Sequence, residues 1–94
     1  IDPILEGFDG LALGEKVIFA LEAKKNVGTD KFNENESFIR VFDWQGKPLA
    51  YLEIAHDLST IAFDEDKRML YATDYSHELV LRFDLSNELK RWVK

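Results

Sequence analysis

The chain contains no cysteine, and its 94 residues include only two prolines, five glycines and one methionine. Without cysteine there is no disulfide, no thiolate nucleophile and no cysteine-ligated zinc. No apolar stretch approaches the ~20 residues that a membrane-spanning helix needs, and no signal peptide is visible. We therefore expect no membrane span in this segment. No feature of the sequence indicates a cofactor.

Positive charge is also scarce, because 12 Lys and Arg residues stand against 18 Asp and Glu residues and leave a net charge of −6. A surface that binds nucleic acid needs a basic face, so we expect no nucleic-acid partner. Lys90, Arg91 and Lys94 form a basic cluster at the chain end, where a short charge run is usually a solvated terminus. A hydrophobic content of 46% is typical of a folded domain.

A repeat of about 41 residues organises the chain, because Phe42-Asp43 recurs as Phe83-Asp84 (83 − 42 = 41). With the same offset of 41 residues, Tyr51-Leu52 aligns with Trp92-Val93 in the sequence. A period of roughly 40–45 residues filled with short strands is typical of a four-stranded propeller blade. The sequence thus predicts a single unit, 1–94, with a first blade over about 3–54 and a second over about 55–94.

Alternation of apolar residues, with Gly and Pro between the runs, predicts the strands. These cover 16–23, 37–44, 49–54, 58–63, 69–75, 78–85 and a last one near 89–93. In two segments the sequence alone does not decide between a strand and a helix. Good helix formers occupy 15–25, where the strand-prone Val17, Ile18 and Phe19 favour a strand. At 88–94 the apolar residues also fit a helical spacing, and we interpret this segment as a strand.

Three motifs carry a family resemblance: Val41-Phe42-Asp43-Trp44 with Gly46 closing the turn, Ile61-Ala62-Phe63-Asp64-Glu65, and Leu70-Tyr71-Ala72. Together they resemble the C-terminal blades of TolB-like six-bladed β-propeller proteins of the Bacteroidetes type. The resemblance implies an all-β fold of two four-stranded antiparallel propeller blades, a fragment of a six-bladed β-propeller. It also implies a periplasmic or cell-envelope location. Because the chain begins at Ile1 rather than methionine, we expect a fragment of a longer protein.

Two blades cannot close a six-bladed ring, so the faces that neighbouring blades would bury need another cover. We expect these faces to carry Phe38, Phe42, Trp44, Leu81 and Phe83. Three covers are open, since terminal repeats need such capping: the two blades pack on each other, further copies of this chain close the ring, or the remaining blades of a parent chain close it.

In a propeller blade, the connection entering the first strand and the connection between the second and third strands lie at one end. Propellers usually bind ligands at that end. The candidate ligand-binding residues are therefore those expected there, namely His56, Asp57, Asp74, Tyr75, His77, Asp30 and Asn33. The spacing of 21 between the two histidines (77 − 56 = 21) matches no compact metal motif. We therefore assign no metal ligand, and Asp57 and Asp74 are expected to cap turns through backbone N–H groups.

Other polar and aromatic residues have structural interpretations. Asp43, Asp64 and Asp84 each follow a Phe at a strand end, which favours a repeated structural hydrogen bond over catalytic acids. The aromatic residues expected in the blade core are Trp44, Tyr51, Tyr71 and Trp92.

No catalytic residue is assigned, because no nucleophile elbow and no phosphate-binding loop is present. The sequence favours a non-enzymatic binding or scaffolding module for an unidentified protein or small-molecule ligand. The alternative is part of a metal-dependent propeller hydrolase or lyase, with ligands drawn from several blades.

Overall fold

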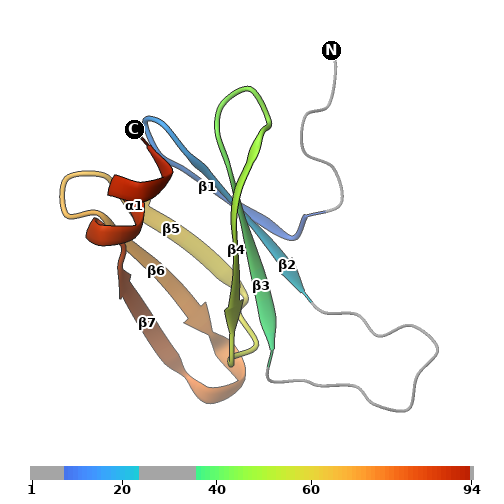
Figure 1. Cartoon of the computed structure of the whole chain (residues 1–94). Helices are drawn as coiled ribbons and strands as arrows, with labels where there is room; N and C mark the ends of the chain where they lie inside the picture. Colours follow the sequence, from blue (N-terminus) through green and yellow to red (C-terminus); the bar gives the residue numbers. More distant parts are fainter. Residues whose placement is uncertain (1–7, 24–35, 94) are drawn as a thin grey trace.

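The computed structural model describes residues 8–23 and 36–93, which form two antiparallel sheets facing each other (Figure 1). Sheet A has four strands and sheet B has three, each in sequential order. The strands of sheet A are β1 (Gly10–Leu13), β2 (Ile18–Ala23), β3 (Ser37–Phe42) and β4 (Pro48–Ile54). Those of sheet B are β5 (Thr60–Asp64), β6 (Met69–Asp74) and β7 (Leu79–Asp84). A 3₁₀ turn, η1 (Tyr75–His77), joins β6 to β7, and helix α1 (Ser86–Trp92) follows β7.

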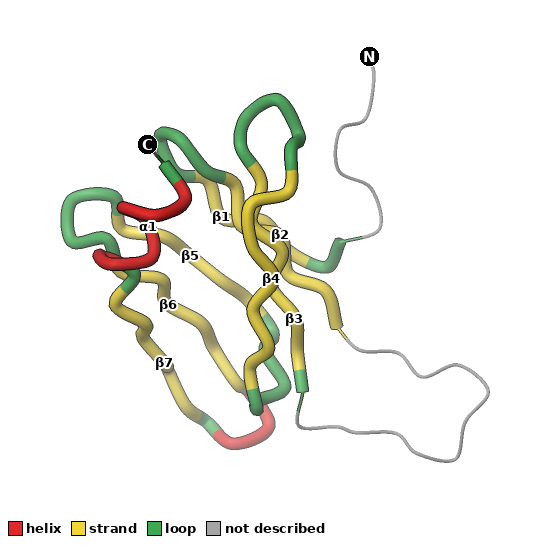
Figure 2. The backbone as a smooth tube through the Cα atoms, in the orientation of Figure 1, coloured by secondary structure: helices red, strands yellow, loops and turns green. Residues whose placement is uncertain are grey.

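The connections gather at two ends of the molecule (Figure 2). The β1–β2, β3–β4 and β5–β6 turns lie at one end together with α1, and we call this the hairpin end. The β4–β5 connection and η1 lie at the opposite end, which we call the loop end. The two sheets approach each other closely along β1 and β5.

The core lies between the sheets and is built from alternate residues of each strand. In β3, Ser37, Ile39 and Val41 are buried, whereas Phe38 and Phe42 lie on the opposite face. A strand turns successive side chains to opposite faces, so this burial follows directly from the pleat. The rings of Phe19 from sheet A and Phe63 from sheet B meet at a centroid distance of 4.9 Å.

The predicted strand over 16–23 is confirmed, because β2 covers Ile18–Ala23. Its residues pair with β1 on one side and β3 on the other. Val17, Ile18, Phe19, Ala20 and Leu21 are all buried. Burial on both faces explains the continuous apolar run, which single-sequence propensity cannot assign to strand or helix.

The predicted last strand near 89–93 is wrong, because α1 occupies Ser86–Trp92. Leu85 and Leu89 are buried, and Trp92 packs against the same core. These three residues fall on one helical face, and Glu88 in the first turn with Lys90 and Arg91 in the last complements the helix dipole. The expectation of two four-stranded sheets is therefore met by sheet A alone, and sheet B has three strands.

Sheet A also has an outer face, turned away from sheet B, which exposes large apolar side chains. Leu11 is 49% exposed and Leu13 is 59% exposed, and Tyr51 is 45% exposed. Phe38 stacks on Tyr51, with ring centroids 5.1 Å apart. The expectation that Tyr51 and Trp44 fill the core is wrong, because Trp44 is also 45% exposed and its indole N–H donates to the Gly14 carbonyl.

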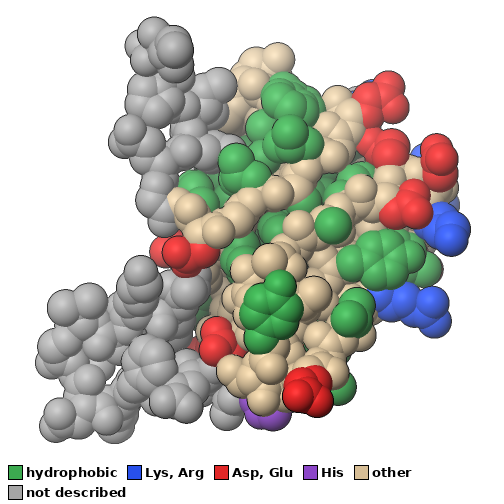
Figure 3. All heavy atoms as spheres, turned by 180° about the vertical axis from the view of Figure 1, so that it is seen from behind, with side chains coloured by type: hydrophobic (Ala, Val, Ile, Leu, Met, Phe, Trp, Pro, Cys, Tyr) green, Lys and Arg blue, Asp and Glu red, His purple; other side chains and the backbone are tan. Residues whose placement is uncertain are grey.

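Leu81 and Phe83 were expected on a face that needs a cover, and the packing of the two sheets on each other supplies it. Both are partly buried and pack against the core between the sheets. Figure 3 shows hydrophobic side chains spread over the middle of one face of the molecule, with the visible Lys and Arg side chains along one side. Within the described part of the chain, no helix is long and apolar enough to cross a membrane.

Candidate functional site

Asp74 is the centre of the loop end. It is the last residue of β6 and is fully buried, which is unusual for a carboxylate. Its Oδ2 lies 2.8 Å from His77 Nδ1 and 3.3 Å from His56 Nδ1. Its Oδ1 accepts a hydrogen bond from the His77 backbone N–H at 3.2 Å. One buried carboxylate therefore holds two histidines that are 21 residues apart in the sequence (77 − 56 = 21).

The local sequence builds this arrangement from a tight turn. Asp74 is the N-cap of η1, and the turn ends at Glu78, whose φ of 53° is left-handed. The Glu78 backbone N–H donates to the Tyr75 carbonyl at 3.3 Å. Asp favours such positions because its short carboxylate reaches backbone N–H groups two or three residues on. The turn therefore places the His77 side chain beside the carboxylate of Asp74, the residue that caps it.

The electrostatics of Asp74 favour the charged form. Burial disfavours ionisation, but the hydrogen bonds from the His77 side chain, the His77 backbone and the His56 side chain outweigh it. The pKa of the Asp74 carboxyl therefore lies below its ordinary value. An ionised carboxylate only accepts hydrogen bonds, so each histidine donates to Asp74 from Nδ1. The side chains of His56 and His77 are 37% and 54% exposed.

Ser37 is the second buried polar residue among those the structure describes, beside Asp74. Its Oγ accepts a hydrogen bond from the Leu58 backbone N–H at 2.9 Å. Ser37 thus fixes the β4–β5 connection to the start of β3, and Asp74 fixes the same connection through His56. Sequence reasoning missed Ser37. The one available signal was its place on the same strand face as Ile39 and Val41.

The structure brings together three of the seven predicted ligand-binding residues, namely His56, Asp74 and His77. Tyr75 lies beside them and is 69% exposed. Asp57 lies in the β4–β5 connection, and its predicted turn-capping bond is not formed within the described residues. Asp30 and Asn33 lie outside the described residues.

The arrangement is a hydrogen-bonded cluster rather than a chelate. Within 8–23 and 36–93, no group of three or more histidine and acidic side chains is placed to hold a metal ion. What the cluster offers at the surface is two partly exposed imidazole rings, each oriented by a shared carboxylate. Such rings can form hydrogen bonds with a polar ligand or partner.

The interpretation of the three Phe-Asp pairs as structural is confirmed. Asp43 Oδ1 accepts from the backbone N–H groups of Gln45 and Lys47 at 3.0 and 2.9 Å. Asp64 accepts from the Lys67 backbone N–H at 3.2 Å. Asp84 accepts from both the backbone N–H and the hydroxyl of Ser86. Each carboxylate therefore bonds within the connection that follows its own strand, a turn after Asp43 and Asp64 and the start of α1 after Asp84.

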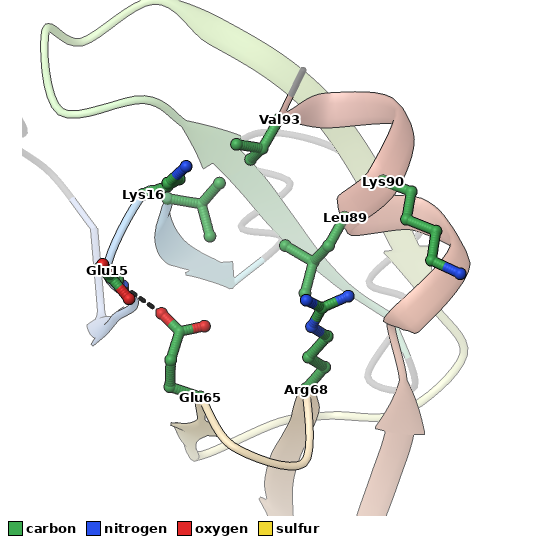
Figure 4. A pocket seen from close by; sticks show the side chains of 8 residues that line it. Glu15, Lys16, Glu65, Arg68, Leu89, Lys90 and Val93 are labelled. Atoms are coloured by element: carbon green, nitrogen blue, oxygen red, sulfur yellow. Dashed lines mark hydrogen bonds between the residues drawn. The ribbon is translucent and has the colours of Figure 1, made fainter.

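A cavity of about 240 Å³ opens at the hairpin end, between the β1–β2 turn, the β5–β6 turn and α1 (Figure 4). The Arg68 side chain points toward Leu89, whereas Lys90 points away from the cavity centre (Figure 4). On the other wall the Glu65 carboxylate accepts a hydrogen bond from the Glu15 backbone N–H (Figure 4). Because both signs of charge line it, this cavity shows no preference for an anion or a cation.

A second, shallower hollow of about 300 Å³ lies on the outer face of sheet A and is lined by Phe42, Leu49 and Tyr51 among others. The Arg40 guanidinium lies 4.6 Å from the Tyr51 ring centroid and bonds to Glu22 at 2.9 Å. The hydrogen bond to Glu22 raises the pKa of Arg40 above its ordinary value. Arg40 is thereby held over an aromatic ring on the outer face of sheet A.

Comparisons with protein-family models, with curated proteins and with solved structures found no match.

Proposed function

We propose that this chain is a non-enzymatic binding and scaffolding module, built from repeated β-sheets that associate through their faces. The observation that carries the proposal is the relation between the repeat and the packing. Leu81 and Phe83 pack sheet B against the core, and 41 residues earlier their counterparts are Arg40 and Phe42 (81 − 41 = 40; 83 − 41 = 42). In sheet A these counterparts lie on the exposed outer face.

The proposed role of this outer face is to receive another sheet in the manner in which sheet A receives sheet B. Three exposed side chains on or beside it, Leu11, Leu13 and Tyr51, are 49%, 59% and 45% exposed. Apolar surface gains about 25 cal/mol per Å² when it is buried. Contiguous apolar patches on a soluble protein often mark interaction sites.

This arrangement agrees with the TolB-like resemblance, in which the two sheets are two of the six blades of a propeller in the cell envelope. The loop end is the proposed contact surface of such a module, with the Nε2 atoms of His56 and His77 and the exposed ring of Tyr75 offered to a partner. The support for this assignment is the buried anchor at Asp74, which fixes both imidazoles in place.

The test is the solution mass of the chain by light scattering, combined with binding of the dye ANS, which reports exposed apolar surface. We expect concentration-dependent association, or strong dye binding by the monomer. Leu13→Lys should reduce whichever is observed. Tyr75→Lys is the matched control, because Tyr75 is even more exposed, at 69%, but lies at the loop end. A monomer that binds no dye, or equal effects of the two variants, would contradict the proposal.

A further inference from the structure

The outer edge of β7 is an open strand edge. In sheet A, β4 pairs with β3, but sheet B ends at β7, and no strand of the described chain pairs with its far side. The repeat places the counterpart of β4 at residue 89 and beyond (48 + 41 = 89), where the chain forms α1 instead. In Figure 1, β7 is the outermost strand of sheet B, and α1 sits above the hairpin end. The position that a fourth strand would take is therefore not filled by this helix.

The hydrogen-bonding groups on this edge can be assigned from the register. In an antiparallel pair, residues that bond to the neighbouring strand alternate with residues that do not. The Leu85 backbone N–H donates to the Arg68 carbonyl at 3.0 Å, and the pairing of β6 with β7 continues from there without a shift. The alternation therefore directs the backbone groups of Leu81 and Phe83 toward β6. Those of Val80 and Arg82 point to the open edge.

The open edge of β7 is less protected than the matching edge of sheet A. Natural edge strands are protected against pairing by proline, by charged side chains, lysine above all, or by a bulge. At the matching edge of sheet A, β4 begins with Pro48 and its pairing with β3 shifts between Val41 and Phe42. By contrast, β7 reads LVLRFD, with an unbroken register, no proline and no lysine, and Arg82 is the one basic residue along it. Of the two outer strands, β7 is the one suited to pair with another chain.

The side chains beside the edge indicate the chemistry of the strand that fits. On the core side, Leu79 is 43% exposed and is followed by the partly buried Leu81 and Phe83. On the other side, Val80 is 73% exposed, and the exposed Arg82 forms no ion pair within the described residues. A matching strand carries apolar residues at alternate positions toward the core and an aromatic or acidic residue near Arg82.

Sheet A contains a strand of this kind. In β4, Ala50, Leu52 and Ile54 lie on the core side, opposite Val41, Ile39 and Ser37 in the β3 register. Its other face carries Tyr51 and Glu53, and the ring of Tyr51 lies under the guanidinium of Arg40 on β3.

We propose that the open edge of β7 binds an extended segment of a partner protein as an antiparallel fourth strand of sheet B. The segment has the alternation of β4, apolar toward Leu81 and aromatic or acidic toward Arg82. Backbone hydrogen bonds to Val80 and Arg82 supply the affinity, and the alternate side chains supply the specificity. This inference rests on the edge of β7 and does not depend on further sheets docking on the outer face of sheet A.

The probe is a fluorescein-labelled synthetic peptide with the β4 sequence, PLAYLEI, titrated with the wild-type chain by fluorescence anisotropy. We expect saturable binding at one peptide per chain. A peptide of the same sequence, N-methylated at alternate residues along the pairing edge, keeps every side chain but loses backbone donors. It should bind about tenfold more weakly or worse. Equal binding of the two peptides would overturn the proposal.

The position at which the peptide binds is tested by amide hydrogen exchange on the wild-type chain. The Val80 and Arg82 amides should become protected when peptide is added. Val80→Pro removes one outward donor at a position where an edge strand tolerates proline. It should abolish binding, whereas Val80→Thr, which keeps the donor and the branched side chain, should bind normally. If the peptide instead protects the sheet A amides and its binding is lost in Leu13→Lys, the edge assignment is wrong. In that case the outer-face proposal stands.

Discussion

Phe42 and Phe83 occupy equivalent positions of the repeat but lie in different surroundings. Phe83 packs against the core between the two sheets. Phe42 lies on the outer face of sheet A, where its ring meets the edge of Phe8 at a centroid distance of 6.0 Å and an interplanar angle of 70°. The same residue type at the same place in the repeat therefore contributes to the core in one sheet and to an open surface in the other.

This difference predicts unequal costs of truncation. Phe83→Ala should lower the free energy of unfolding by about 3 kcal/mol, because it leaves a cavity beside Leu70 and Leu81. Phe42→Ala should cost only about 1 kcal/mol, since its ring is covered on one side. Urea denaturation of the two variants and the wild type measures both values. Equal losses would show that the outer face of sheet A is covered in solution.

Gly14, in the β1–β2 turn, leaves no room for a side chain. A Cβ at this position would lie 3.1 Å and 3.2 Å from two ring atoms of Phe63 and 3.2 Å from the Val17 carbonyl oxygen. The Gly14 backbone N–H also donates to that carbonyl at 2.8 Å, so the turn cannot open easily. Gly14→Ala should therefore destabilise the protein by about 1–3 kcal/mol through overpacking.

Gly10→Ala, in the adjoining strand β1, is the matched control. Its Cβ would meet Leu21 atoms at 3.7 Å, which is an ordinary van der Waals contact. Replacing a strand glycine reduces the entropy lost on folding, so this variant should be neutral or more stable by about 0.5 kcal/mol. Thermal melts of both variants give the comparison. A neutral Gly14→Ala would mean that Phe63 moves aside, and that sheets A and B are less tightly packed at β1 and β5.

The pattern of the sequence predicted most strands of this fold, but not which face of each strand is buried. In β3, Ile39 and Val41 alternate with Phe38 and Phe42, and both sets are apolar. Periodicity separates the two faces, but the choice between them depends on where sheet B packs, which is not a local property. For this reason Tyr51 and Trp44 were expected in the core and instead lie half exposed.

The helix at the C-terminal end illustrates a second limit. Leu85, Leu89 and Trp92 suit a helical stripe, and the repeat argued for a strand over the same residues. Tertiary packing against the core decides between them. The histidine cluster was easier to predict, because topology alone brings the β4–β5 connection and the β6–β7 turn to one end. The role of Asp74 as the shared acceptor could not be predicted, because it depends on the distances from its carboxylate to the side chains of His56 and His77.

Ser37 should be more important for stability than its size suggests. Ser37→Ala removes the acceptor of the Leu58 backbone N–H and leaves that buried donor unpaired. An unpaired buried donor costs about 1–3 kcal/mol. Ser76→Ala, at an exposed position of η1, is the control and should be neutral. Chemical denaturation measures both, and a neutral Ser37→Ala would mean that water reaches the β4–β5 connection.

Asp74 should make the protein sensitive to acid. Its folded pKa is lowered by hydrogen bonds from His77 and His56, which overcome the opposing effect of burial. A group with a depressed folded pKa contributes stability that is fully present above its unfolded pKa of about 3.9 and is lost as pH falls through the folded pKa. The free energy of unfolding should therefore fall as the pH drops below about 4, and Asp84, whose pKa is lowered by the Ser86 hydroxyl and backbone N–H, should add to the fall.

Asp74→Asn isolates this contribution, because an amide is neutral at every pH. The variant should be less stable than the wild type at pH 7, since it loses the charged acceptor shared by two histidines. Its stability should then change less between pH 5 and pH 2. Asp57→Asn is the control, because Asp57 forms no side-chain hydrogen bond within the described residues. Urea titrations at a series of pH values test both. An Asp74→Asn curve parallel to the wild type would show that folding does not lower the pKa of Asp74.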